Sequence, residues 1–251
     1  MSSILEKIPL TWIPPVIMDE IPHGDMPGDK VVIGEEHINK AQLIFPLLLE
    51  ELKKVSKEKI VISVYGGSGV GKSEIASLLA FYFSQIEVRS YTMSGDNYPH
   101  RIPVYNDKER EKVYEKFGVE GLRKYLGSEY EINYKEVNEI IRQFHDGKDA
   151  IFLRRMGRQI TELWYEEVAF AETKVLIIEW THGNNANLQE IDVPIFLNST
   201  PEETLEHRRS RNRDGEVDSL FTTLVLNLEQ ELLASQRNTA KICVSKRGEV
   251  E

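Results

Sequence analysis

The sequence predicts a three-layer α/β fold, in which helices cover both faces of a mostly parallel sheet. Three segments, 59–65 (KIVISVY), 174–179 (KVLIIE) and 193–198 (VPIFLN), are short, continuously apolar and rich in β-branched residues. Such runs are typical of parallel strands that are buried on both faces. Segments with helical periodicity separate them, and a glycine-rich turn joins the first run to a helix. This alternation of strands and helices favours parallel pairing.

The overall composition limits the function classes. The chain has 251 residues, a formal net charge of −10 and an isoelectric point near 5.3. This balance argues against a protein that wraps nucleic acid, because phosphate neutralisation needs clustered Lys and Arg. Cys243 is the only cysteine, which excludes an internal disulfide framework and a multi-cysteine zinc site. No run approaches the roughly 20 apolar residues that span a bilayer, so we expect a cytoplasmic protein with no membrane contact.

The beginning of the chain is predicted to be an extension of the main domain. Residues 1–35 are rich in proline, which lacks an amide donor and disfavours regular structure. Apolar spacing predicts a helix over 36–54, with a kink or a restart at Pro46. We therefore divide the chain into an N-terminal extension with a leading helix, 1–56, and a main domain, 57–251. The extension is compatible with packing on the core and with contact to a second subunit of a homodimer.

Elements in the first half of the main domain follow from periodicity and end signals. The glycine-rich turn is followed by a helix through about Gln85, and an alternating stretch, 86–93, predicts the next strand. An irregular segment comes next. A further helix is predicted to start near Asn106, with Glu109 three residues later as a capping-box variant.

The second half continues the alternation. Residues 133–145 form the clearest amphipathic helix, and Gly147 is its expected stop. The pattern then predicts a helix over 159–170, ahead of the second apolar strand. A long helix over 218–236 and a last strand over 241–245 complete the domain.

A phosphate-binding loop follows the first strand. Residues 66–73 (GGSGVGKS) fit G-x-x-x-x-G-K-[ST] between an apolar strand and a helix. Glycines let successive amides turn toward an anion, and the helix presents unpaired N–H groups to it. We expect Lys72 to bridge the β and γ phosphates of ATP and the Ser73 hydroxyl to hold Mg²⁺. This predicts a P-loop NTPase fold with these nucleotide contacts: Gly66, Gly67, Ser68, Gly69, Val70, Gly71, Lys72 and Ser73.

A second polar motif follows the next strand. In 94–107 (SGDNYPHRIPVYND), an acid, a histidine and an arginine lie close together. The stretch resembles the G-D-S-F-H-R motif of the phosphoribulokinase and uridine kinase superfamily, with Pro99 inserted. The resemblance implies that Asp96 is the base on the substrate hydroxyl, whereas a turn-forming acid is the structural alternative. His100 and Arg101 are candidates for binding an anionic acceptor, or are polar surface residues.

The same stretch also resembles the D-G-D-N motif of adenylylsulfate kinases. Gly95, Asp96 and Asn97 match that motif, and Ser94 stands in place of its first acid. Adenylylsulfate is therefore an alternative acceptor. The other substrate motifs expected of that family are not found in the sequence.

The second apolar strand ends in another acid, Glu179. In uridine kinase relatives the equivalent strand ends in an E-G pair whose acid supports the metal, and Trp180 replaces that glycine here. A carboxylate at the carboxyl end of a central strand lies where open α/β sheets bind ligands, so Glu179 is expected to help hold Mg²⁺. His182, three residues later, is a candidate for contacting substrate.

An arginine-rich segment follows the third strand. Thr200, Pro201 and Glu203 predict the start of a helix at N-cap, N1 and N3. That helix carries 207–214 (HRRSRNRD), which resembles the lid of these kinases, with Gly215 as a hinge. Arginines on a mobile helix end can stabilise the charge of the transferred phosphoryl group, although a solvated helix face has the same pattern. The expected lid residues are Arg208, Arg211 and Arg213.

These features predict an ATP- and Mg²⁺-dependent kinase that phosphorylates a hydroxyl of a small molecule, such as a sugar, a sugar phosphate or a nucleoside. Arg154 belongs to a further basic cluster, which either binds an acceptor phosphate or forms a solvated face. A GTPase switch is disfavoured because no guanine-selecting N-K-x-D follows a later strand. A regulatory ATPase and a non-catalytic nucleotide-binding module are the remaining alternatives.

Overall fold

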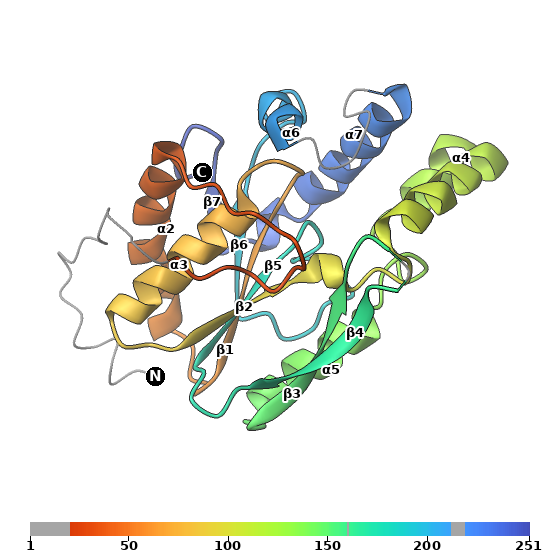
Figure 1. Cartoon of the computed structure of the whole chain (residues 1–251). Coiled ribbons are helices and arrows are strands. Elements are labelled where there is room, and N and C mark those ends of the chain that lie inside the picture. The colour runs from red at the N-terminus through yellow and green to blue at the C-terminus, as the bar shows by residue number, and fades with distance from the viewer. Residues whose placement is uncertain (1–20, 160, 212–218) are drawn as a thin grey trace.

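The computed structural model describes residues 21–159, 161–211 and 219–251 (Figure 1). Its main sheet has five strands in the order β2-β5-β1-β6-β7, and every pairing in it is parallel. The α/β class is therefore confirmed. The strands of this sheet are β1 (Ile60–Gly66), β2 (Ser90–Ser94), β5 (Val175–Glu179), β6 (Val193–Leu197) and β7 (Ile242–Val244).

Three strands bring their carboxyl ends to the same place. Glu179, the last residue of β5, lies beside Val64 of β1 and beside Ser94 of β2. The strand order places β1 in the centre, with later strands added on both sides of it. Open α/β sheets bind ligands at such a point, outside the carboxyl ends of the strands.

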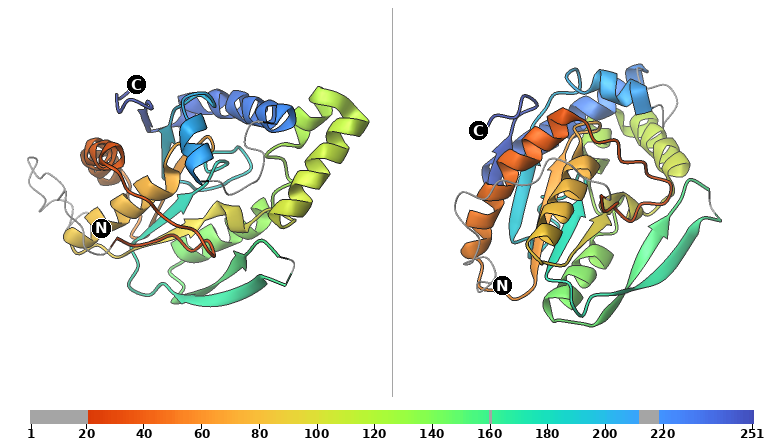
Figure 2. Two further views of the ribbon diagram at one scale, coloured as in Figure 1. Left: turned by 45° about the horizontal axis from the view of Figure 1, so that its top comes forward. Right: turned by 60° about the vertical axis from the view of Figure 1, so that its left-hand side comes forward.

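Helices cover both faces of the sheet, as the apolar strands predict (Figure 2). Along β1, Ile62 faces one core together with α2 (Glu35–Lys53) and α3 (Lys72–Gln85). Val61 faces the opposite core together with α5 (Tyr134–His145). Successive side chains of a strand point to opposite faces, so a continuous apolar run supplies both cores.

The leading helix α2 runs through Pro46 as one helix, so the predicted restart does not occur there. Proline inside a helix costs about 3 kcal/mol. The neighbouring residues Phe45, Leu48 and Leu49 are buried in the core that α2 shares with α3. Their burial, worth about 1.5–3 kcal/mol for each large apolar side chain, offsets that cost.

The predicted helix over 159–170 is wrong. Leu163–Ala169 is instead a strand, β4, which pairs antiparallel with β3 (Ala150–Met156) in a separate two-stranded sheet. The β4 sequence, LWYEEVA, is rich in aromatic and β-branched residues, which favour strands. Pairing with β3 stabilises β4 as a strand. The local sequence pattern on which the helix prediction was based does not reveal that pairing.

The next helix in the chain also differs from expectation at its start. α4 (Pro103–Tyr125) begins at Pro103, the first-turn position that suits proline, rather than near Asn106. Glu109 does not cap it, because the N-cap residue Ile102 has no side-chain cap hydrogen bond. Gly118 interrupts the helix with φ 64° and ψ −163°, which produces a kink.

The predicted N-cap pair beyond β6 forms, but the helix starts later than expected. Thr200 N–H donates to Glu203 at 2.9 Å and Glu203 N–H donates to Thr200 Oγ1 at 3.3 Å, yet residues 201–204 are turns. The remaining elements are α6 (Leu205–Arg211), α7 (Leu220–Ser235) and the short helices η1 (Gly95–Asn97) and η2 (Arg237–Thr239). Among the described helices, none combines the length and apolar character that crossing a bilayer requires.

Candidate active site

The phosphate loop connects β1 to α3, and glycines determine its shape. A Cβ at Gly66 would lie 2.5 Å from the carbonyl oxygen of Leu197, so β6 passes too close for any side chain there. Gly69 and Gly71 have φ values of 75° and 97°, in the left-handed region that glycine adopts without strain. The turn therefore brings the N-terminus of α3 to the end of β1, the arrangement that binds phosphates.

Lys72 lies across this loop. Its Nζ donates to the carbonyl oxygen of Gly67 at 3.0 Å. Its charge also acts on the groups around it. It offsets part of the rise that burial causes in the pKa of Glu179, and it adds to the fall that burial causes in the pKa of His182. Lys72 is therefore positioned between the loop and the polar groups at the end of β5.

Glu179 accepts hydrogen bonds from two serine hydroxyls at the carboxyl ends of the strands. Ser94 Oγ donates to its Oε1 at 2.6 Å, and Ser73 Oγ donates to its Oε2 at 3.2 Å. Burial, together with the nearby charge of Asp96, raises its pKa to about 8. A carboxylate and a hydroxyl are hard oxygen ligands of the kind that Mg²⁺ takes, so Ser73 and Glu179 fit such an ion.

Asp96 follows β2 in the short helix η1, and it is exposed. Its charge raises the pKa of Glu179 and, more weakly, that of Glu229 on α7. Asp96 therefore lies within electrostatic reach of the groups beside the phosphate loop. An exposed carboxylate at this position is accessible to a substrate hydroxyl.

The N-terminal segment contributes a carboxylate that the sequence analysis did not single out. Asp25 Oδ1 accepts hydrogen bonds from the backbone N–H of Ser94 at 2.7 Å and from Asn97 Nδ2 at 3.1 Å. Its Oδ2 lies 2.8 Å from Arg155 of β3. Burial raises the pKa of Asp25 to about 6, more than the Arg155 charge lowers it. Asp25 thus fixes the segment that carries Asp96.

His100 and Arg101 contact the chain itself. His100 Nε2 lies 2.9 Å from the carbonyl oxygen of Glu129. Arg101 donates to Tyr125 Oη at 3.1 Å and to the carbonyl oxygen of Tyr130 at 3.3 Å. Both side chains therefore hold the motif against the segment that follows α4, and their predicted role toward substrate stays a prediction.

Two neighbouring arginines of the predicted basic cluster, Arg154 and Arg155, lie on β3. Their side chains point to opposite faces of the strand, and both contact other residues of the protein. Arg154 is buried, donates to the carbonyl oxygen of Pro99 at 2.9 Å and lies 3.7 Å from Glu136. Arg155 pairs with Asp25 and with Glu166, at 2.8 and 3.0 Å. Both residues are buried, so they do not form the solvated face that was the alternative.

His182 lies buried beyond the end of β5. Burial lowers its pKa to about 4, so the imidazole is neutral at physiological pH. Its Nδ1 makes no hydrogen bond to the described residues. Gly127 makes room for the ring, because a Cβ at Gly127 would lie 2.9 Å from that nitrogen. The ring is therefore held as an uncharged group near Lys72 and Glu131, whose charges both act on its pKa.

A buried ion network missing from the sequence predictions surrounds this histidine. Arg110 of α4 lies 2.6 Å from Glu131 and 3.1 Å from Glu229 of α7. Glu131 also accepts from Asn106 Nδ2 at 2.9 Å and from the backbone N–H of Gly127 at 2.7 Å. No local pattern distinguishes Arg110 from the other charges of α4, so only the fold reveals the network.

One predicted lid residue contacts the phosphate loop. A Cβ at Gly69 would lie 2.8 Å from Arg208 Cγ, so the side chain passes directly over the loop. Arg208 also donates to the carbonyl oxygen of Pro201 at 2.7 Å. Arg211 is the last residue of α6. Arg213 and the predicted hinge Gly215 lie outside the described residues.

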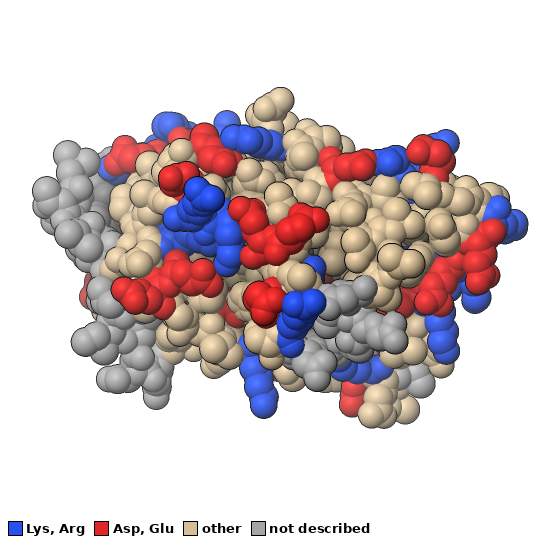
Figure 3. Space-filling model, turned by 90° about the horizontal axis from the view of Figure 1, so that it is seen from above, with Lys and Arg blue, Asp and Glu red and all other residues tan. Residues whose placement is uncertain are grey.

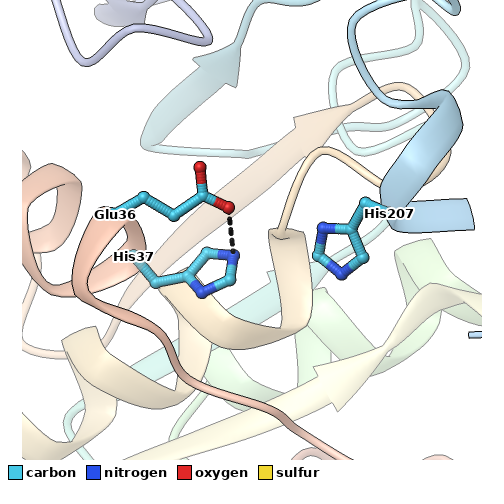
Figure 4. Close-up of side chains that lie close together, drawn as sticks. All are labelled: Glu36, His37 and His207. Carbon is cyan, nitrogen blue, oxygen red and sulfur yellow. Dashed lines mark ion pairs between the residues drawn. The ribbon is translucent and has the colours of Figure 1, made fainter. Parts of the chain in front are cut away.

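α2 approaches the other side of the loop through His37 (Figure 4). A Cβ at Gly71 would lie 2.9 Å from His37 Cδ2. Glu36, His37 and His207 of α6 have side-chain atoms close enough for a metal ion. However, His37 Nδ1 accepts the backbone N–H of Gly34 at 3.0 Å, so the neutral ring carries its proton on Nε2, the atom that faces Glu36 at 3.6 Å. This tautomer suits hydrogen bonding rather than metal ligation.

The surface above the carboxyl edge carries mixed charge. Seen from that side, basic and acidic side chains are interspersed over the part of the face that the described residues cover (Figure 3). This agrees with the formal net charge of −10. The view thus gives no sign of the broad basic field on which nucleic-acid wrapping depends.

The chain is similar in sequence to part of a longer protein whose name includes a kinase. No protein-family model matches the chain. A bifunctional alpha-galactosidase/sucrose kinase from Mediterraneibacter gnavus is 48% identical over 195 residues. The match covers 78% of this chain but only 21% of that much longer protein.

Solved structures resemble the fold. Phosphoribulokinase from Rhodobacter spheroides superposes with a TM-score of 0.56 and 17% identity, over 76% of this chain and 71% of that one. D-glycerate 3-kinase from Cryptococcus neoformans gives a TM-score of 0.55 and 13% identity, over 87% of this chain and 98% of that one. These similarities do not favour the adenylylsulfate alternative. The chain therefore has the fold of the P-loop kinases that include phosphoribulokinase, as its phosphate loop and the Asp96 motif predicted.

Proposed function

We propose that this protein transfers the γ-phosphoryl group of ATP to a hydroxyl of a small neutral sugar, with sucrose as the first candidate. The observation that carries the proposal is the convergence of Lys72, Ser73, Glu179 and Asp96 at the carboxyl edge of the sheet. Phosphoryl transfer needs a phosphate cradle, a metal site and a carboxylate near the acceptor. These residues have the chemistry for all three.

Each residue has a distinct role in this proposal. Lys72 binds the β and γ phosphates, and Asp96 accepts the proton of the attacking hydroxyl. Ser73 and Glu179 hold Mg²⁺, which when bound neutralises charge on the β and γ phosphates. Arg208, whose side chain lies beside Gly69, stabilises the charge of the transferred phosphoryl group. Arg211 and Arg213 are candidates for the same role on the basis of the sequence.

The proposed acceptor is neutral because the nearby guanidinium groups are engaged within the protein. Arg101 donates to Tyr125 and Tyr130. Arg154 and Arg155 contact Glu136 and Asp25, respectively. A sugar phosphate needs such groups for bidentate recognition, so these contacts favour an uncharged sugar. The name of the Mediterraneibacter gnavus relative, a bifunctional alpha-galactosidase/sucrose kinase, supports the same choice.

Acceptor-dependent ADP release tests the proposal. The purified chain is mixed with MgATP and, in separate reactions, with sucrose, glucose, fructose, fructose 6-phosphate, uridine and adenylylsulfate. We expect a neutral sugar to give the largest stimulation, and phosphorus NMR to show a new sugar monophosphate. ADP release that no acceptor raises above background would instead support a regulatory ATPase or a nucleotide-binding module. Maximal stimulation by adenylylsulfate or by a sugar phosphate would contradict the choice of a neutral sugar.

A further inference from the structure

A cavity of about 500 Å³ lies outside the phosphoryl-transfer centre, along the edge strand β2. One wall is the N-terminal segment 22–27, a second comes from β2 with Ala80 of α3, and the third is the β3–β4 hairpin. We call it the edge pocket. Its volume falls within the roughly 300–1,000 Å³ that is usual for small-molecule sites. None of its lining residues belongs to the phosphate loop or is Asp96 or Glu179.

The polar groups of the edge pocket are positioned by a buried ion pair. Arg155 donates to Asp25 at 2.8 Å, to Glu166 at 3.0 Å and to Tyr91 Oη at 2.8 Å. Tyr91 Oη in turn donates to Asp25 at 3.0 Å. These side chains are therefore pre-organised before any ligand arrives, which lowers the entropy cost of binding.

The remaining surface of the edge pocket selects a chemical class. Trp164, opposite Arg155 on the hairpin, is 45% exposed and offers a flat apolar ring. Two carboxylates, Asp25 and Glu166, stand against the single guanidinium of Arg155, which disfavours an anion. The Glu166 side chain is mostly exposed and offers carboxylate oxygens as acceptors. A carboxylate acceptor beside an aromatic face suits a neutral ligand with O–H donors and an apolar C–H face.

We propose that the edge pocket is a binding site for a neutral carbohydrate, separate from the phosphoryl-transfer centre and linked to it through Asp25. Asp25 accepts the N–H of Ser94, and Ser94 Oγ donates to Glu179. A sugar that contacts the Asp25 network thus acts on residues one hydrogen bond away from the metal ligand. A sugar in the pocket is an effector or a second bound sugar, and it does not meet Asp96.

Sugar binding to the full chain without ATP tests the site, with sucrose and glucose as probes and glucose 6-phosphate as their charged counterpart. Calorimetry is compared for the unchanged protein and for Trp164→Ala and Trp164→Phe. Phe152→Ala is the matched control, because Phe152 is an exposed aromatic residue, 61% exposed, on the same hairpin. A sugar at the acceptor site adds equally to all of these titrations.

We expect Trp164→Ala to bind one sugar fewer, or to bind it about tenfold more weakly, while Trp164→Phe and Phe152→Ala retain that binding. The Ser94 amide resonance should shift on sugar binding in the unchanged protein and not in Trp164→Ala.

Equal sugar stoichiometry and affinity in the unchanged protein and Trp164→Ala would overturn the proposal. Tighter Trp164-dependent binding of glucose 6-phosphate than of glucose would overturn the neutral class. A Ser94 amide resonance that does not shift when sugar binds would overturn the link through Asp25. These outcomes are separate from the kinase assay, because binding is measured without ATP and does not depend on phosphoryl transfer.

Discussion

Ser73 of the phosphate loop donates a hydrogen bond to Glu179, the last residue of β5, with a distance of 3.2 Å between Oγ and Oε2. The two residues are separated by 106 positions in the sequence. They meet because β1 and β5 are adjacent parallel strands whose carboxyl ends coincide. This contact joins the nucleotide loop to the carboxylate that we propose as a metal ligand.

Replacing Glu179 by Gln should raise the Mg²⁺ concentration needed for half-maximal turnover. The amide keeps the hydrogen bond from a hydroxyl but loses the negative charge that a hard cation requires. We expect a shift of tenfold or more, about 1.4 kcal/mol in metal binding, measured by ADP release over a Mg²⁺ titration. Glu167→Gln on exposed β4 is the matched control. Equal Mg²⁺ dependence in the two variants would remove Glu179 from the metal site.

Replacing Lys72 by Ala should abolish most ATP turnover, by roughly 10²–10³-fold, as expected when a pre-organised charge near the transferred group is removed. The fold should persist, because among the described residues the Lys72 side chain donates a hydrogen bond only to the carbonyl oxygen of Gly67. Lys112, an exposed lysine of α4, provides the control substitution. A rate close to that of the unchanged protein would refute the phosphate-loop assignment.

Replacing Asp96 by Asn should slow phosphoryl transfer by roughly 10²–10⁴-fold, the usual contribution of a general base. ATP affinity, measured separately by calorimetry, should change little, because Asp96 lies in η1 after β2 and is not part of the phosphate loop. A parallel loss of MgATP affinity would argue that Asp96 acts on the metal instead.

The parts of the fold that sequence reasoning predicted are those that local patterns determine. The strand that ends at Gly66 is apolar throughout, and the helix that starts at Lys72 follows a glycine-rich turn. The parallel order then places Glu179 beside both, without any further information. The hairpin was missed because Leu163–Ala169 depends on a partner strand, and its charged residues are compatible with a helix face as well.

The candidate site was predicted only where a motif marks it. Asp25 reaches Ser94 across 69 positions, and it lies in a proline-rich segment that has no regular pattern. In the sequence, Arg110 is one of many charged residues on a helix. Its pairing with Glu131 and Glu229 is visible only in the folded structure. Long-range polar contacts of this kind arise from packing, which no local pattern encodes. The roles of the candidate site residues toward substrate stay predictions.

His182 should make the protein less stable in mild acid. Its pKa in the folded state is about 4, below the value of 6.5 for an exposed histidine, so the unfolded chain binds the proton more readily. Its stabilising contribution is therefore complete above about pH 6.5 and is lost as the pH falls toward 4. Melting temperatures between pH 7.5 and 4.5 should fall less steeply for His182→Gln than for the unchanged protein. Exposed His100→Gln should keep the original slope, and an unchanged slope in His182→Gln would contradict the assignment.

Arg110 should be essential for stability as well as for the shape of the site. Replacing it by Met leaves Glu131, which is fully buried, and Glu229 without their common cation. Removing one partner of a buried ion pair costs about 3 kcal/mol or more of the free energy of unfolding. Because Arg110 is partly exposed, we expect a loss near the lower end of that range. Urea unfolding measures the loss.

Arg142→Met is the matched control, because Arg142 pairs with Glu139 and Asp146 on the exposed face of α5. This variant should leave the unfolding midpoint nearly unchanged. If both variants unfold at the same urea concentration, the Arg110 network does not hold α4 and α7 together. A second replacement, Glu131→Gln in the Arg110→Met background, should recover part of the loss, because it removes the charge that Arg110 leaves buried.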